Sequence, residues 1–377
     1  MTNKSVPFVD LTRQFVDLED DFVNIFKSIG RSGQYVLGDA LKSFEEEMAD
    51  YCGVKHAVGV ANGTDALILG MKALGIGSGD EVITVPNSFI SSVGAIMTVG
   101  ATPRFVDVKN DLNMDPSHLE RVINSKTKAI VPVHLFGQCA NMDAILKLAK
   151  KHNLFVIEDT AQAIGAHYKC NDGSTKKAGT IGTVGCTSFF PSKNLGCYGD
   201  GGAIFTNDDD LASKIRKVAN HGQSVQYIHD EVGVNSRLDS IQAAILRIKL
   251  RKLDTYNKAR ILAAQKYDTK FKEHPKLTIP VRSEYSNHVF HQYTLKLNGV
   301  DRDALREHLT QNNIPSGIYY PIPLHLQKAY LDARYKKGDF PVTEDLCSSV
   351  ISLPMHTELD DEQIAFITKT VIDFITD

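Results

Sequence analysis

One lysine stands where an apolar strand gives way to a glycine-rich turn. Lys193 belongs to the segment Thr187–Gly196, and the turn Tyr198–Gly202 follows it. The next run, Ala203–Phe205, is buried in character. A lysine that is partly desolvated at a strand end has a lowered pKa and can attack a carbonyl carbon. A solvated surface lysine is the ordinary alternative.

A second segment offers an acid at the mouth of a strand. The apolar run Phe155–Ile157 ends in Glu158 and Asp159, and Gln162 follows three residues later. A carboxylate in this place can hold a protonated ring nitrogen, and an amide can bond a substituent of the same ring. By itself, Asp159 is equally well interpreted as a helix cap.

A third segment offers a site for an anion. In Ala61–Leu67, Gly63 permits close approach of another backbone, and Thr64 stands where a helix N-cap is expected. Free N–H groups and the helix dipole attract anions to such a terminus. Alone, this pattern also describes an ordinary capped helix.

A fourth segment, Gly233–Asp239, opens a long amphipathic helix. Asn235 is a candidate cap, and Arg237 could bind an anion, although a capped helix again explains both. The first three segments together provide a Schiff-base lysine, an acid for a ring nitrogen and an anion-binding terminus. Pyridoxal 5'-phosphate (PLP) requires these groups, and it would itself supply the electron sink.

With these motifs combined, the chain resembles the DegT/DnrJ/EryC/StrS family of nucleotide-sugar aminotransferases. The motifs are Asn62–Thr64, Glu158–Gln162 and Ser188–Lys193, and the resemblance runs from Pro7–Leu11 to Ser352–His356. It implies an α/β, fold-type I PLP-dependent transferase whose mostly parallel sheet is covered by helices. It also implies a homodimer with shared active sites.

The resemblance assigns roles by position. Lys193 would form the Schiff base, Asp159 would hold the pyridine nitrogen, and Gln162 would lie near the ring hydroxyl. The other cofactor contacts would be Gly63, Thr64 and Ser188 around the phosphate, Phe89 stacked on the ring, and Asn235 from the other subunit. The substrate is expected to contact Tyr35, Arg237, Tyr319, Tyr320 and His325. No metal is expected.

The expected reaction moves an amino group from L-glutamate to a keto carbon of a nucleotide-linked hexose. C3 is favoured and C4 is the alternative, on a UDP- or dTDP-linked sugar for glycan, lipopolysaccharide or O-antigen synthesis. Arg237 would suit a uronate carboxylate but could equally serve a structural ion pair. The family often has His-Tyr-Pro where this chain has Tyr319–Pro321. That departure affects the identity of the sugar more than the reaction.

The elements that must position these residues alternate between strands and helices from about residue 50 to 250. Such alternation predicts a largely parallel sheet covered on both faces. The expected division is a large PLP-binding domain, 1–250, with an N-terminal helical segment, and a small α+β domain, 251–377. The predicted strands are Ala57–Ala61, Val82–Val85, Arg104–Val108, Ala129–His134, Phe155–Glu158, Thr187–Phe190 and Gly202–Thr206. One predicted helix begins at Thr64, and others span Ser91–Val99, Met142–His152 and Leu211–Val218. A long amphipathic helix is expected from the spacing of Leu238, Ile241, Ile245 and Ile248, and Ser236–Tyr256 is interpreted as the passage into the second domain.

Composition excludes several other classes. The 42 Lys+Arg nearly balance the 45 Asp+Glu, so no basic surface for nucleic acid is expected. None of the six cysteines forms a C-x-x-C pair, and free thiols in the cytoplasm are expected. The uncharged stretch 83–103 is long enough for a membrane span, but its proline, asparagine and hydroxyl residues favour a buried strand and helix.

Three rival functions remain. A PLP-dependent sugar dehydratase would carry histidine in place of Lys193. A ligand-binding protein that keeps the fold without turnover would lack catalytic groups that are present here. A dinucleotide-dependent dehydrogenase would need a G-x-G-x-x-G cradle after the first strand, which the sequence lacks.

Overall fold

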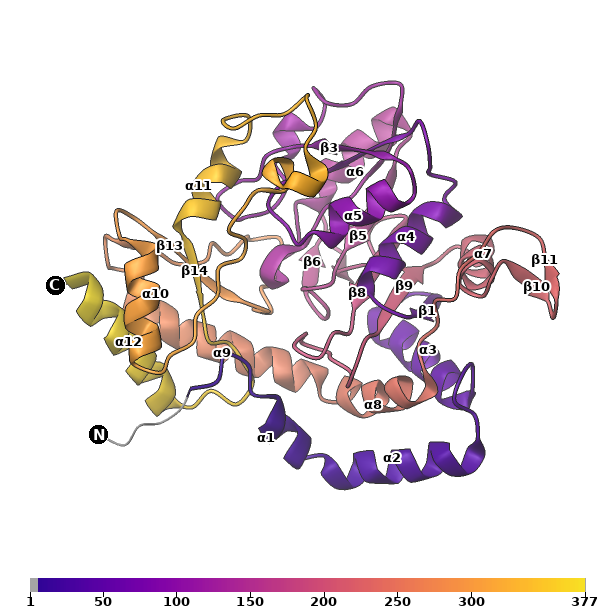
Figure 1. Cartoon of the computed structure of the whole chain (residues 1–377), viewed down its shortest axis with the longest axis horizontal. Coiled ribbons are helices and arrows are strands. Elements are labelled where there is room, and N and C mark those ends of the chain that lie inside the picture. The colour runs from indigo at the N-terminus through magenta and orange to yellow at the C-terminus, as the bar shows by residue number, and fades with distance from the viewer. Residues whose placement is uncertain (1–5, 377) are drawn as a thin grey trace.

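The computed structural model, which describes residues 6–376, is built around a seven-stranded sheet (Figure 1). Every neighbouring pair of strands is parallel except the two pairs that involve β9. The prediction of a largely parallel α/β sheet is therefore confirmed, with one antiparallel strand. In spatial order the strands are β1 (His56–Val60), β9 (Gly202–Thr206), β8 (Val184–Ser188), β5 (Phe155–Asp159), β4 (Thr127–Ile130), β2 (Glu81–Thr84) and β3 (Thr102–Phe105).

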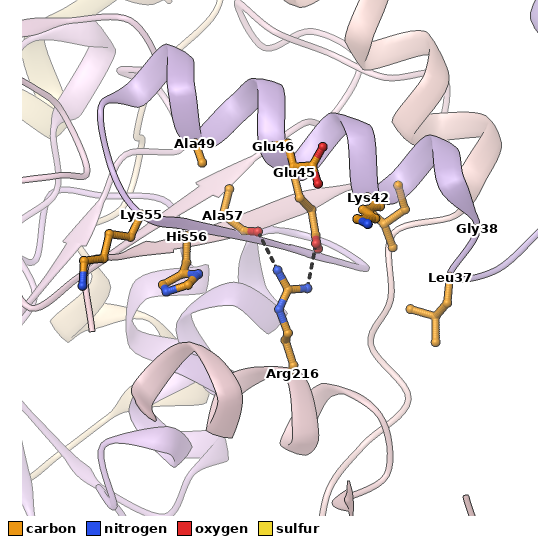
Figure 2. Close-up of a pocket in the computed structure, with 11 residues that line it drawn as sticks. Leu37, Gly38, Lys42, Glu45, Glu46, Ala49, Lys55, His56, Ala57 and Arg216 are labelled. Atoms are coloured by element: carbon orange, nitrogen blue, oxygen red, sulfur yellow. Dashed lines mark hydrogen bonds and ion pairs between the residues drawn. The ribbon is translucent and has the colours of Figure 1, made fainter. Parts of the chain in front are cut away.

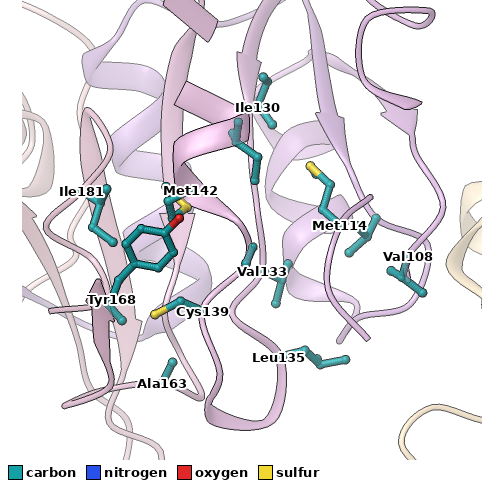
Figure 3. Packing of buried hydrophobic residues seen from close by; sticks show 14 of the residues in the cluster. Val108, Met114, Ile130, Val133, Leu135, Cys139, Met142, Ala163, Tyr168 and Ile181 are labelled. Atoms are coloured by element: carbon teal, nitrogen blue, oxygen red, sulfur yellow. The ribbon is translucent and has the colours of Figure 1, made fainter. Parts of the chain in front are cut away.

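Alternate residues of each strand point to opposite faces of the sheet, and helices bury both faces. Val82 and Ile157 belong to one apolar core, whereas Ile83 and Val156 belong to a second. Figure 3 shows part of the second core, with Ile130, Met142 and Tyr168. The first core is covered by α4 (Gly63–Ala73), α5 (Ser91–Thr98) and α7 (Asp209–Ala219). The opposite face is covered by α6 (Met142–His152), α3 (Asp39–Cys52) and α8 (Ser240–Leu250).

The uncharged stretch 83–103 forms the end of β2, a turn and α5, as predicted. Most of its apolar side chains, including Val85, Val93 and Ile96, are buried in the protein core, whereas Phe89, Ile90 and Met97 are exposed. Within residues 6–376, no helix has the length and apolar character needed to cross a bilayer.

The amphipathic helix predicted from Leu238, Ile241, Ile245 and Ile248 is present, but it begins after Leu238 and is followed by a break. The chain forms α8 from Ser240, breaks at Arg251 and Lys252, and continues as α9 (Leu253–Phe271). Asn235 does not cap α8, because Asp239 occupies the N-cap position. The chain thus reaches its second half along two successive helices, which lie beneath the sheet in Figure 1.

A further apolar core forms where the C-terminal elements pack on α9. It also includes Val6 from the N-terminal segment. The division into 1–250 and 251–377 stays a prediction. The elements of this core are α9, α10 (Arg302–Gln311), α12 (Asp361–Thr376) and an antiparallel sheet of β12 (Leu277–Thr278), β13 (Tyr293–Leu297) and β14 (Val350–Leu353).

The remaining elements pack around these cores or project from them. The hairpin of β10 and β11 projects from the body (Figure 1), and Tyr227 at its tip is 82% exposed. Neither this hairpin nor the second one, formed by β6 and β7, was among the predicted elements. The remaining elements are α1 (Leu11–Val16), α2 (Glu19–Ser32), β6 (His167–Lys169), β7 (Thr175–Lys177), β10 (Gln223–Val225), β11 (Ile228–His229) and α11 (Pro341–Ser349).

Candidate active site

A cavity of about 470 Å³ lies where β5 and β8 end and α4 begins. Lys193, Asp159 and Gly63 line it together, although they are far apart in the sequence. Parallel strands place their carboxyl ends at one edge of a sheet, and ligands of open α/β sheets bind at that edge. Three of the four segments that the sequence analysis singled out therefore meet at one site.

Lys193 and Asp159 both line this cavity, and each affects the pKa of the other. Burial lowers the pKa of Lys193 to about 8, although the Asp159 carboxylate opposes that shift. Burial raises the pKa of Asp159, while Ala161 N–H, the Ser92 hydroxyl and Lys193 favour its ionised form. Ser92 donates to Asp159 Oδ2 at 2.9 Å. The neutral and charged forms of the amine are therefore both accessible near pH 7 to 8. The Asp159 carboxylate is fixed by its hydrogen bond from Ser92 and is only 7% exposed.

Gln162 is held in one orientation by two hydrogen bonds. Its Oε1 accepts from Phe136 N–H at 2.8 Å, and its Nε2 donates to the Tyr320 hydroxyl at 3.1 Å. One proton of Nε2 remains for a group in the cavity. Tyr320 thereby connects the C-terminal half of the chain to the side of the cavity that carries Asp159.

The N-terminus of α4 provides an anion cradle. Thr64 is not the N-cap, because Asn62 accepts from Asp65 N–H at 2.8 Å and fills that position. The N–H groups of Gly63 and Thr64 lie in the first turn, where no helical carbonyl reaches them. Ser188 packs against Gly63 so closely that a Cβ on residue 63 would lie 2.6 Å from the Ser188 Cβ. Glycine is therefore required at residue 63.

We expect Gly63→Ala to weaken PLP binding by about 10- to 100-fold, because the added methyl group must displace Ser188 from the cradle. A fluorescence titration of the cofactor-free protein with PLP measures this change. Gly70→Ala in the same helix is the matched control, since its Cβ would meet neighbours only at 3.5 Å. Equal PLP affinities for the two variants would contradict the cradle.

A buried network supports Asp159 from behind. The Glu158 carboxylate accepts from the N–H groups of Gly179, Ile181 and Gly182 at 2.9, 2.6 and 2.6 Å. It also pairs with His134 Nε2 at 2.8 Å, and both side chains are fully buried. The backbone N–H of His134 donates to the carbonyl of Asp159 at 3.0 Å. Glu158 therefore fixes the strand end from which Asp159 projects.

Several residues of this cavity were not predicted as site residues, and two of them are buried and polar. His291 and Gln292 are 6% and 7% exposed, and both line the cavity. His291 Nδ1 and Gln292 Oε1 are buried without a hydrogen-bond partner in the described structure. Burial and the cations Lys193 and Arg260 hold the pKa of His291 well below its usual value. Unpaired buried polar atoms are rare, and these two indicate a polar ligand or water.

Five further predicted residues line the cavity. Thr64 Oγ1 lies 2.8 Å from Ser91 Oγ, and Ser188 faces the start of α4. Phe89 is 54% exposed, with its ring 6.1 Å from that of Tyr320. The five are Thr64, Phe89, Ser188, Tyr319 and Tyr320.

The structure places four predicted residues outside this cavity. His325 is buried against Phe340, with Nε2 3.2 Å from Glu344 Oε1, so it supports the C-terminal loop. Arg237 donates to Asn220 at 3.0 Å and lines a separate cavity. Asn235 is exposed beside it, and Tyr35 is 59% exposed.

Another cavity of about 400 Å³ opens beside α3 (Figure 2). Its central charges satisfy each other, because Arg216 donates to Glu45 at 2.6 Å and to the Ala57 carbonyl at 3.2 Å. None of the predicted site residues lines it. Within residues 6–376, no cluster of three or more His, Cys, Asp or Glu side chains could hold a metal ion.

The chemistry of the main cavity fits PLP. The cradle at Gly63 and Ser188 suits a phosphate, Lys193 suits an aldehyde carbon, and Asp159 suits a ring nitrogen. Gln162 has a donor left for a ring hydroxyl. PLP, when bound, supplies an electron sink for the bonds of an amino acid's Cα. Fold and site together define a PLP-dependent aminotransferase.

Comparison with known proteins identifies the family. Residues 16–372 match the DegT/DnrJ/EryC1/StrS aminotransferase family, and the chain belongs to it. It is 45% identical over 373 residues to the UDP-N-acetyl-3-dehydro-alpha-D-glucosamine 3-aminotransferase of Acidithiobacillus ferrooxidans, covering 98% of both chains. It is 43% identical to the UDP-2-acetamido-2-deoxy-3-oxo-D-glucuronate aminotransferase of Pseudomonas aeruginosa, covering 96% and 98%. The crystal structure of S. venezuelae DesV in complex with a ketimine intermediate superimposes with a TM-score of 0.95 at 39% identity, covering 99% of both chains.

Proposed function

We propose that this enzyme transfers the amino group of L-glutamate to the C3 keto carbon of a nucleotide-linked hexose. One observation carries the proposal: a cavity that brings Lys193, Asp159 and the Gly63 cradle together. The two UDP-sugar relatives, at 43% and 45% identity, are named for amination of 3-oxo or 3-dehydro sugars. The proposed setting is a cytoplasmic step in glycan or surface-polysaccharide synthesis, such as that of lipopolysaccharide O-antigen.

Lys193 is the proposed acid–base group. With PLP held by Asp159 and the Gly63 cradle, the free Lys193 amine would take the proton from the glutamate Cα and deliver it to the cofactor's C4′. Its pKa of about 8 suits both steps, since the neutral and charged forms are both accessible near pH 7 to 8. In the second half of the reaction, Lys193 moves the proton in the reverse direction on the sugar carbon.

The proposed enzyme is a homodimer, and residues outside the cavity act on the partner's site. Asn235 would reach the partner's phosphate cradle, and Tyr35 and Arg237 would contact its substrate. Their exposure supports this assignment, because Asn235 and Tyr35 have solvent-facing side chains. The projecting hairpin next to Asn235 exposes Val225, Tyr227 and Val232, which a second copy would cover.

The test is amino transfer to defined keto sugars. The purified enzyme is loaded with PLP and incubated with L-glutamate and each of four acceptors: UDP- and dTDP-linked hexoses with a ketone at C3 or at C4. Release of 2-oxoglutarate and an amino sugar with nitrogen at C3, located by NMR, is the expected result. Amination of the C4 ketones alone would overturn the C3 assignment. Loss of substrate oxygen without 2-oxoglutarate would indicate a dehydratase.

A further inference from the structure

The backbone just after Lys193 is held in a tight, buried turn. Lys193 N–H donates to the Phe190 carbonyl at 2.8 Å, and Cys197 N–H donates to the Phe189 carbonyl at 2.8 Å. A Cβ on Gly196 would lie 2.3 Å from the Pro191 carbonyl oxygen, so the chain crosses itself closely here. The position of the Lys193 Cα therefore depends on what fixes this turn, which we define as residues 193–198.

Three side chains from α8 and α9 are tied to this turn. Gln242 accepts from the N–H of Tyr198 at 2.8 Å and donates to its carbonyl at 3.0 Å. Lys249 Nζ donates to the Gly196 carbonyl at 2.5 Å. Asn257 Oδ1 accepts from the side-chain Nδ2 of Asn194 at 2.8 Å. Gln242 and Lys249 are seven residues apart in α8, about two helical turns, so they lie on the same face of that helix. Asn257 lies in α9, beyond the break, and its side chain reaches the same turn.

Lys249 stands out among the three because it is a buried cation. Its side chain is 1% exposed, and within residues 6–376 no carboxylate lies within ion-pair distance of it. Apolar residues of the same helix, such as Leu246, pack with Leu195 from the turn. An isolated buried charge is costly, and a methionine of similar size would fill this space without that cost. The Gly196 carbonyl and the Tyr198 ring, 5.3 Å from Nζ, are the interactions that lysine gains here.

We propose that Lys249 is a positioning residue for Lys193. Its ammonium group holds the Gly196 carbonyl and so fixes the turn that presents the Lys193 amine to the cavity. The expected effect on catalysis rests on the proposed function, in which Lys193 is the reacting amine. The effect of Lys249 on the conformation of the turn does not depend on that function. Catalytic groups need placement within about half an ångström, and this buried tie supplies such placement from outside the cavity.

Amide hydrogen exchange of the cofactor-free protein tests the tie directly. In Lys249→Met, we expect exchange at Cys197 and Tyr198 to accelerate about tenfold while the sheet strands keep their protection. Gln242→Met, at a half-buried position, should accelerate exchange at the same two amides and serves if Lys249→Met does not fold. Ile245→Ala is the matched control, because Ile245 lies on the same helix but packs on Leu18 and Phe22. It should lower the melting temperature without selective exchange in the turn.

Reductive trapping with PLP and borohydride measures whether the conformation of the turn affects the reactivity of the Lys193 amine. Mass spectrometry should locate the label on Lys193 in wild type, and trapping should be about tenfold slower in Lys249→Met and normal in Ile245→Ala. Lys249→Arg, which keeps a donor, should recover part of the rate. Unchanged turn exchange together with an unchanged trapping rate in Lys249→Met and Gln242→Met would overturn the proposal. Wild-type labelling at a lysine other than Lys193 would refute the proposed function instead, and the exchange data would still decide whether Lys249 fixes the turn.

Discussion

We expect Lys193→Ala to reduce amino transfer from glutamate by about 10⁴-fold or more, because it removes both the group that links the cofactor and the proton carrier. The phosphate cradle and Asp159 are untouched, so the variant should still bind PLP and its aminated form. Single-turnover absorbance with glutamate measures the loss, and borohydride should leave no label on the cavity. Burial lowers the pKa of Lys193 to about 8, and Lys193 is the only lysine that lines the cavity in the described structure.

Lys128→Ala is the matched control for this substitution. Lys128 lies on β4 of the same sheet, but its side chain is exposed and lies away from the cavity. The control should keep wild-type turnover and wild-type labelling of Lys193. Turnover of Lys193→Ala within tenfold of wild type would refute the assignment, because no other amine lines the cavity in the described structure.

Helices and strands could be predicted where the hydrophobic spacing is regular and residues typical of caps or turns stand at both ends. Helix α6 has the predicted bounds, Met142–His152, since Asn141 caps its start and Asn153 adopts the left-handed conformation at its end. Strand β9 also agrees with the predicted Gly202–Thr206. Strand β8 was predicted three residues late, and Gly185 explains the error. This glycine resembles a turn signal, but it serves the close approach of the Gly179 carbonyl, 2.1 Å from where a Cβ would lie.

The cavity itself was only partly predictable. Lys193, Asp159 and Gly63 stand at strand ends or a helix start, and sheet geometry brings such positions together. His291 and Gln292 reach the cavity because the segment before β13 packs against the Phe136 backbone, a long-range contact with no local signal. The same limit applies to His325, whose partners in the fold are Glu344 and Phe340.

Asp159→Asn is expected to lower the single-turnover rate with glutamate by about 10³-fold while leaving PLP bound. The substitution keeps the shape of the side chain and its contact with Ser92 but removes the charge. In the cofactor-free protein, burial raises the pKa of Asp159, so the carboxylate needs a positive partner to stay ionised. A protonated ring nitrogen is such a partner, and each group then holds the other in its charged form. Breaking a buried ion pair costs about 3–5 kcal/mol, which corresponds to a rate effect of about this size.

Asp107→Asn provides the matched control, because Asp107 is also a buried aspartate near a strand end of the same sheet. It is 4% exposed and accepts from Val342 N–H and Thr343 N–H at 3.0 Å, away from the cavity. Its substitution should lower stability without changing the cofactor's absorbance or the single-turnover rate. A single-turnover rate for Asp159→Asn equal to that of wild type would mean that the ring nitrogen has no charged partner at Asp159. The electron sink would then operate without help from this carboxylate, and the buried network of Glu158 and His134 would have only a structural role.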